Sequence, residues 1–323
     1  MSNLTFRSLA SSSRGNAYMV SDGETTLLLE CGLPYKKLAE KSGFTLMDTT
    51  ACFVTHEHKD HSHAAGQLIK RGVPVFMSEG TARALELWDA EIIEPNVPIM
   101  VGAFRVMAFR VAHDAADPVG YLIDDTRTGE RLMFAADTRS LPYIVPRLTY
   151  IAVECNYEES LLAASQRIPE SLKTRIRHSH FEVRDVIRWL KKQDLSHVMT
   201  IYLLHLSAGN SRAAEWQQMF AREFPGIEIK ICEEQTTMNE KHYDNLYEMA
   251  QNTSEPGARL YAELAAIRFT NADKYSQDNR SEFIRSIAIL YNMLDILCIA
   301  LDCEDEVQDM AEQLAAEKVL PRA

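Results

Sequence analysis

The sequence lacks the features that identify a membrane protein or a disulfide-rich protein. Its six cysteines are scattered without a C-x-x-C pair, which favours reduced thiols over a disulfide framework or a zinc ribbon. The longest apolar stretch, 284–301, is interrupted by Arg285, Asn292 and Asp295, so it is too short and too polar to span a bilayer. The opening MSNLTFRSLASSS does not have the basic-then-apolar order of a signal peptide. We therefore expect a cytoplasmic protein that does not contact a membrane.

Positive charge is also scarce. The formal net charge is −12, and −8 of it lies after residue 238, where sixteen acidic residues stand against eight basic ones. A strongly acidic protein is a poor generic binder of nucleic acid. The first 238 residues carry only −4, which leaves room for a local site that binds an anion.

The pattern of apolar and turn residues predicts a mixed α/β domain over residues 1–238. The whole chain has 323 residues, which allows one large domain and a smaller one. The residues at 11–16 have turn chemistry. We expect strands at 4–9, 17–20, 26–30, 51–55, 74–78, 104–111, 119–123, 131–135, 150–154, 199–204 and 227–232, and helices at 63–71, 80–88, 182–192 and 211–224.

The sequence pattern of residues 239–323 predicts an all-helical C-terminal extension. Helical patterns occur at 241–253, 259–269, 281–301 and 304–318, without a strand signal. The helix at 281–301 is apolar on nearly every side, so it must be buried within its own bundle or against a partner. Of these two arrangements we favour a homodimer formed through the C-terminal helices. The acidic run at 302–309 is interpreted as a solvated face rather than as a cation site.

A cluster of metal-ligand residue types lies between a predicted strand and a predicted helix. It reads THEHKDH at 55–61. Alternate residues of an extended chain point to the same side, so His56 and His58 can face one metal. The chain then turns, and Asp60 and His61 can face a second metal. Imidazole and carboxylate ligands suit zinc, and also manganese or iron. The position of the cluster argues against a surface loop that happens to be rich in histidine. The neighbouring His63 is expected to be solvated or to support a ligand without binding metal.

The pattern H-x-H-x-D-H resembles the signature of the metallo-β-lactamase superfamily. His113, Asp137 and His205 follow in the family's order at the ends of predicted strands. The resemblance implies a metallo-β-lactamase αββα sandwich with two divalent metal ions, of which zinc is favoured over manganese. It also implies a ligand set: His56, His58 and His113 for one metal, Asp60, His61 and His205 for the other, and Asp137 as the bridge.

The chain departs from this family at one acidic residue. The family has Asp in a pattern similar to L-L-V-D-x-G, whereas residues 29–32 of this chain read L-E-C-G. In the family this acid orients a ligand rather than binding metal itself. We expect Glu30 to serve in the same way after a small backbone shift.

Fold alone does not determine the reaction, and the segments around Glu154 and His180 favour phosphodiesters. V-E-C at 153–155, S-H-F at 179–181 and L-H-L-S at 204–207 are similar to the phosphodiesterase branch typified by RNase Z. The resemblance implies that His180 is the general acid for the leaving oxygen and that Glu154 is its partner. Such a His–carboxylate pair suits proton donation near neutral pH. His178 is the competing candidate, and Asp60 is expected to orient the attacking hydroxide.

Basic residues are concentrated around His180. A rim that binds phosphate would explain both the sign and the place of this charge, and a solvated helix face is the alternative. The stretch contains Arg167, Lys173, Arg175, Arg177, Arg184, Arg188, Lys191 and Lys192 against Glu170, Glu182 and Asp185, a net charge of +5.

Three further segments resemble the YycJ-type (WalJ-type) exonucleases: LASSSRGN at 9–16, HDAADP at 113–118, and H-L-S-x-x-N at 205–210. Together the resemblances imply a metal-dependent hydrolase that acts as a nuclease on DNA or RNA, through a hydroxide that two metals share and that attacks phosphorus. The acidic C-terminal region favours one alternative, a phosphodiesterase for small cyclic nucleotides of the kind by which phages degrade a nucleotide immune signal. A third interpretation is an interaction protein with a vestigial metal site.

Overall fold

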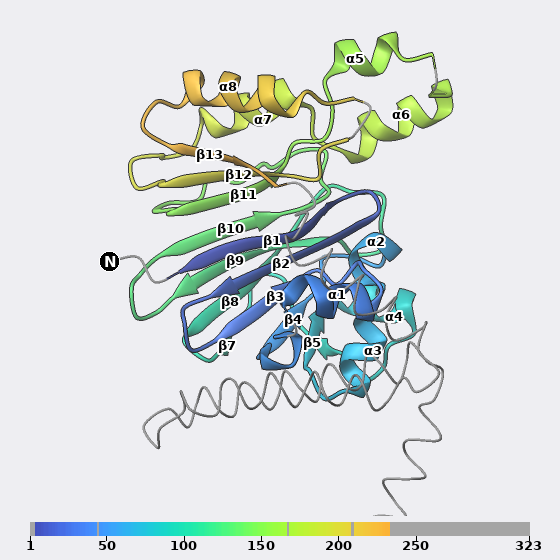
Figure 1. Cartoon of the computed structure of the whole chain (residues 1–323), viewed down its shortest axis with the longest axis vertical. Coiled ribbons are helices and arrows are strands. Elements are labelled where there is room, and N and C mark those ends of the chain that lie inside the picture. Colours follow the sequence, from blue (N-terminus) through green and yellow to red (C-terminus); the bar gives the residue numbers. More distant parts are fainter. Residues whose placement is uncertain (1–3, 44, 167, 208–209, 233–323) are drawn as a thin grey trace, which may run out of the picture. The chain divides into compact units, whose positions relative to one another are not determined.

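The structure is a computed structural model that describes residues 4–43, 45–166, 168–207 and 210–232 (Figure 1). The predicted C-terminal helices at 239–323, the homodimer expected through them and Arg167 lie outside these residues. The larger of two units into which the chain divides comprises Met1–Leu38 and Asp48–Gln235, and the domain boundary at 238 stays a prediction. No helix among the described residues is long and apolar enough to cross a membrane.

The first sheet has six strands in sequence order, β1-β2-β3-β4-β5-β6. The strands β1 to β3 pair antiparallel, and β3 to β6 pair parallel. The turn predicted at 11–16 is too long, because β1 continues to Ser12 and β2 begins at Gly15. The polar Ser11 fits inside a strand because its hydroxyl group bonds to Tyr18 and to the backbone N–H of His205. The strands are β1 (Thr5–Ser12), β2 (Gly15–Ser21), β3 (Thr26–Leu29), β4 (Ala51–Phe53), β5 (Val75–Met77) and β6 (Glu91–Ile92).

The second sheet has seven strands in the order β13-β12-β11-β10-β9-β8-β7. Its strands β7 to β10 pair antiparallel, and β10 to β13 pair parallel. The strands are β7 (Pro98–Val101), β8 (Phe104–Arg110), β9 (Val119–Asp125), β10 (Arg131–Ala135), β11 (Tyr150–Glu154), β12 (Thr200–Leu204) and β13 (Glu228–Ile231).

Apolar side chains from both sheets form one shared core, so the sheets pack face to face. Tyr18 of β2 packs edge-on against Phe134 of β10, with ring centroids 5.3 Å apart. Phe53 of β4 packs edge-on against Tyr121 of β9 at the same distance. The two sheets with helices outside them confirm the predicted sandwich fold.

Helices α7 and α8 cover the outer face of the second sheet (Figure 1). Trp189 of α7, Trp216 and Phe220 of α8 and Ile201 of β12 belong to one buried apolar cluster there. The four helices predicted in this domain are present, although α4 begins one residue before its predicted start and the other ends are shorter. Helices α1, α5 and α6 are not predicted; the buried positions of α6 are Lys173 and Ser179 rather than an apolar stripe. The helices are α1 (Tyr35–Ser42), a 3-10 turn (Leu46–Asp48), α2 (Lys59–Ser62), α3 (Ala65–Lys70), α4 (Glu79–Leu85), α5 (Glu159–Ala164), α6 (Glu170–Ser179), α7 (Val183–Leu190) and α8 (Ala213–Glu223).

The carboxyl ends of several strands meet at one edge of the sandwich. The strands β10, β11 and β12 are parallel, and β8 runs in the same direction because β9 is antiparallel to both β8 and β10. The carboxyl end of β4 reaches the same edge, since the N–H of Val119 donates to the carbonyl of Thr55 at 3.0 Å. Side chains that follow these strands are therefore brought together there.

Candidate metal centre

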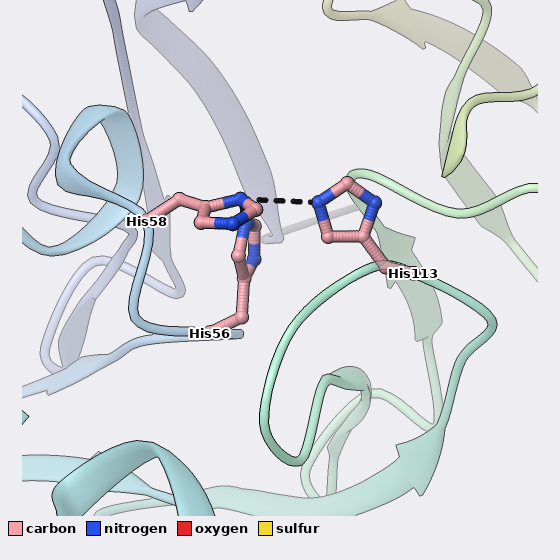
Figure 2. A group of neighbouring side chains, drawn as sticks. All are labelled: His56, His58 and His113. Atoms are coloured by element: carbon pink, nitrogen blue, oxygen red, sulfur yellow. Dashed lines mark hydrogen bonds between the residues drawn. The ribbon is translucent and has the colours of Figure 1, made fainter. Parts of the chain in front are cut away.

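Three histidines converge at this edge and form the first group of candidate ligands (Figure 2). His56 and His58 follow β4, and His113 follows β8. Nδ1 of His58 lies 3.0 Å from Nε2 of His56 and 3.2 Å from Nε2 of His113. Zinc–nitrogen bonds of about 2.0–2.1 Å at tetrahedral angles separate two ligand nitrogens by about 3.3 Å. The three nitrogens are thus spaced as ligands of one ion.

Hydrogen bonds on the far side of two of these rings aim the lone pairs inward. Nδ1 of His113 donates to the carbonyl of Ser179 at 2.9 Å, which leaves Nε2 to face the group. Nδ1 of His56 lies 2.9 Å from the hydroxyl oxygen of Thr55. Burial, followed by the charge of His61, lowers the pKa of His56 well below its usual value. A neutral, oriented imidazole is the form that binds metal.

A second group joins two carboxylates and two histidines: Asp60, His61, Asp137 and His205, whose ligand atoms lie within 4.8 Å of one another. Nε2 of His205 is buried without a hydrogen-bond partner and lies 3.8 Å from Oδ2 of Asp60. Oδ2 of Asp137 lies 3.4 Å from Nε2 of His61 and 3.7 Å from Nε2 of His113. One oxygen of Asp137 therefore faces both groups, as a bridging ligand requires.

The charges of the second group call for a cation at its centre. Burial opposes protonation of His205, but Asp137 and Glu154 together raise its pKa to about 10. Burial likewise opposes the charge of Asp137, yet His205 and His61 hold the pKa of this carboxyl well below its usual range. Protons on the histidines thus balance the carboxylate, and a divalent ion would replace them. The residues fit a metal centre, and their roles as ligands stay predictions.

Glu30 lies where a residue that orients ligands is needed. It is fully buried, and its carboxylate accepts hydrogen bonds from the N–H of Thr55 at 3.2 Å and from its hydroxyl group at 2.5 Å. Oε1 of Glu30 also lies 3.3 Å from Nδ1 of His61. The backbone of Glu30 is left-handed, with φ of 63°, and the shift expected for Glu in place of Asp stays a prediction.

His180 stands beside both groups, with its ring centroid 5.4 Å from that of His113 and 5.5 Å from that of His205. With Asp137, Glu154 and His205 it also forms a third set whose possible ligand atoms lie within 4.8 Å of one another. Its Nδ1 lies 2.5 Å from Oε1 of Glu154, which is the buried last residue of β11. Burial lowers the pKa of His180, but the charge and hydrogen bond of Glu154 outweigh it and raise the pKa above its usual value. The pair predicted from the sequence is thus in contact.

The other two histidines of the sequence hypothesis lie away from the cluster. The ring of His178 is exposed on α6 and its Nδ1 bonds to the carbonyl of Thr174, one turn earlier, at 2.7 Å. His63 is an exposed residue at the end of α2. Of the three candidates, the structure therefore brings only His180 to the groups of candidate ligands.

The basic stretch around His180 is largely paired with acidic residues. Arg175 bonds to Asp114 at 2.7 Å, and Arg177 bonds to Glu159 at 2.7 Å. Lys191 bonds to Glu223 at 2.6 Å. Much of the +5 charge predicted as a rim is therefore neutralised by partners outside the stretch, and a smaller part remains to meet an anion.

Two side chains that position the cluster have no role assigned from the sequence. The amide of Asn16 donates to the carbonyl of Asp60 at 3.3 Å and lies 3.1 Å from Nε2 of His61. The amide of Asn156 donates to the carbonyl of His205 at 2.9 Å, which stabilises the left-handed backbone of that residue, with φ of 52°. Asn16 belongs to the segment at 9–16 that resembles exonucleases. That resemblance was the only sequence feature that could have indicated a role for Asn16 in the site.

Comparisons with known proteins agree with this architecture. A family model described as beta-lactamase superfamily domain matches residues 28–205. The chain is 29% identical over 225 residues to a Bacillus anthracis protein named exodeoxyribonuclease YycJ, and the match covers 64% of this chain and 84% of that protein.

Two solved structures show the same fold. The metallo-beta-lactamase fold protein YhfI from Bacillus subtilis matches 72% of this chain and 98% of its own, with a TM-score of 0.57 and 16% identity. Unliganded yeast PDE1 matches 72% of this chain and 98% of its own, with a TM-score of 0.54 and 12% identity. At these identities the likeness concerns the fold alone.

Proposed function

The chain belongs to the beta-lactamase superfamily, and from this membership we propose that it is a metal-dependent phosphodiesterase that acts as a nuclease on DNA or RNA. The observation that carries the proposal is the His180–Glu154 pair beside the two groups of candidate ligands. Hydrolysis of a phosphodiester with an alkoxide leaving group needs a proton donor at that oxygen. The likeness to a protein named exodeoxyribonuclease, over 84% of its length, supports the same reaction class.

The candidate ligands have distinct roles in this proposal. His56, His58 and His113 would hold one divalent ion, Asp60, His61 and His205 would hold a second, and Asp137 would serve both. Zinc is the favoured ion, because imidazole nitrogens predominate among the ligands. Ions held there would supply an activated water near neutral pH and offset the negative charge that develops on the phosphoryl oxygens.

Two side chains move or hold protons in the proposed reaction. Asp60, which is 26% exposed, accepts a hydrogen bond from the attacking water and orients it. Glu154 holds Nδ1 of His180, so that the other ring nitrogen, Nε2, donates a proton to the departing oxygen. Both roles use atoms that the fold already holds in place.

A hydrolysis panel tests the proposed substrate. Single-stranded DNA, double-stranded DNA, RNA and 3′,5′-cyclic nucleotides are each incubated with the protein, with zinc and with manganese. We expect cleavage of at least one linear nucleic acid and not of the cyclic nucleotides. Hydrolysis of the cyclic nucleotides alone would replace the nuclease by a small-nucleotide phosphodiesterase.

The panel needs a control for contaminating nucleases. The variant His58→Ala, purified in parallel, is expected to be inactive because the first group loses one of its three nitrogens. If the wild type carries stoichiometric metal and cleaves none of the substrates, the enzyme proposal is wrong and an interaction protein is the better interpretation.

A further inference from the structure

A pocket of about 420 Å³ opens beside His180. Its volume lies in the range of pockets that bind small molecules. Four cationic side chains line it together with one carboxylate: Arg139, Arg177, Arg188 and Lys192, with Asp185. The lining therefore carries a net positive charge of 3, in a chain whose overall charge is −12.

The cations of this pocket differ in how they are already paired. Arg177 bonds to Glu159 and Glu170, and Arg188 bonds to Asp185. Within the part of the chain that the structure describes, Arg139 and Lys192 have no such acidic partner. Two cations without a partner inside one pocket are suited to bind a dianion or the diester phosphate of a longer substrate.

The walls of the pocket are fixed by the core of the domain. Trp189 of α7 is 5% exposed, and its indole N–H donates to the carbonyl of Tyr143 at 3.2 Å. The N–H of Arg139 donates to the carbonyl of Ala112 at 2.7 Å, next to His113 and two residues after Asp137. The backbone of Arg139 is therefore held beside two candidate ligands, while the exposed side chains of Arg139 and Lys192 become ordered when an anion binds.

We infer that this pocket binds a second phosphate group of the substrate, on the side of the leaving group. The inference rests on the proposed function, in which His180 protonates the leaving oxygen, because His180 also lines the pocket. A 3′,5′-cyclic mononucleotide has only the phosphate that is attacked. The pocket therefore specifies a polynucleotide, in which the leaving nucleotide carries a phosphate of its own.

Three dinucleotides with the same central bond test the pocket. TpT has no second phosphate, pTpT carries one at its 5′ end, and TpTp carries one at its 3′ end. Kd for each is measured by calorimetry on the metal-free protein, and kcat/KM is measured on the metal-loaded protein. We expect one of the two phosphorylated forms to bind and react about tenfold better than TpT, which corresponds to one charge-assisted contact.

Variants assign this preference to the pocket. Arg139→Ala and Lys192→Ala should each remove most of it while leaving kcat/KM for TpT within about twofold. Lys191→Ala is the matched control, because Lys191 neighbours Lys192 but pairs with Glu223 and does not line the pocket. The control should keep the full preference. Equal binding of the three dinucleotides by the wild type, or a preference that survives both variants, overturns the inference.

The two readouts separate this inference from the proposed function. If the three dinucleotides react equally well, the phosphodiesterase stands and the pocket has another role. If none reacts but one phosphorylated form binds better, and Arg139→Ala abolishes that difference, the pocket stands and the hydrolytic proposal fails.

Discussion

Nδ1 of His180 lies 2.5 Å from Oε1 of Glu154, and the second oxygen of this buried carboxylate is held by two backbone N–H groups. Thr138 donates to Oε2 at 2.7 Å and Phe181 donates to it at 3.3 Å. Glu154 therefore has one fixed orientation, and it fixes the ring of His180 in turn. With candidate metal ligands on both sides of this ring, such a pair suits proton transfer rather than structural support.

The first prediction concerns the dependence on the leaving group. His180→Ala should lower kcat for an oligonucleotide by about 10²–10⁴-fold, the usual contribution of a general acid. It should change hydrolysis of bis(p-nitrophenyl) phosphate little, because p-nitrophenolate leaves without a proton. Metal content should stay that of the wild type, and the exposed His178→Ala serves as the matched control. A loss of metal in His180→Ala would instead make His180 a ligand.

The second prediction concerns the metal count. His58→Ala removes the nitrogen that lies within 3.0 to 3.2 Å of both other histidines in the first group. We expect it to lose about one metal ion per chain by elemental analysis and to lose all measurable turnover. His63→Ala, at an exposed histidine five residues further on, should bind metal and react as the wild type does. Retention of two ions in His58→Ala would contradict the ligand assignment.

The third prediction concerns Glu30, which contacts the candidate ligands without belonging to their groups. Glu30→Gln keeps the shape of the side chain but removes the charge that faces His61 at 3.3 Å. Changes at such supporting residues cost about 10–100-fold in metal affinity, so we expect a loss of this size in competition with a chelator. Glu24→Gln removes an exposed partner of Arg127 and should leave the affinity unchanged. Equal affinities of the two variants would show that Glu30 has no role in the centre.

The candidate ligands could be predicted from the sequence because each carries a local signal. His56, His58, Asp60 and His61 lie within six residues, and His113, Asp137 and His205 each follow a recognisable strand. The positions of these residues at strand ends agreed with one site, but the resemblance to the metallo-β-lactamase superfamily was needed to join them into one ligand set.

The contacts that tune the centre could not be predicted, because they join segments that are distant in sequence. The carbonyl of Ser179 orients His113 across 66 positions, and Arg175 meets Asp114 across 61. A backbone carbonyl has no residue signature, and the partner of a surface arginine depends on how α6 is placed. The sequence therefore showed the charge of the basic stretch but not which part of it stays unpaired.

The last prediction concerns Gly32, which lies against the backbone of Asp60 and His61, two of the candidate ligands. A Cβ atom at this position would stand 1.6 Å from the carbonyl oxygen of Asp60 and 2.7 Å from the backbone nitrogen of His61. Residues 30–32 or residues 60–61 would have to move apart. The N–H of Cys31 donates to the carbonyl of His61 at 2.8 Å, so such a movement would also break this hydrogen bond. Gly32→Ala should therefore lower the free energy of unfolding by about 3 kcal/mol or more, as severe overpacking does.

A second glycine provides the control for this substitution. At Gly66, inside helix α3, a Cβ atom would meet only a side-chain carbon of Leu87 at 3.4 Å. Gly66→Ala should be neutral or stabilise the protein by up to about 1 kcal/mol, because alanine favours the helix. Denaturant unfolding of both variants, with metal and after chelation, measures the difference. If Gly32→Ala keeps both its stability and its metal, the close packing of residues 30–32 against residues 60–61 is not what positions the second group of ligands.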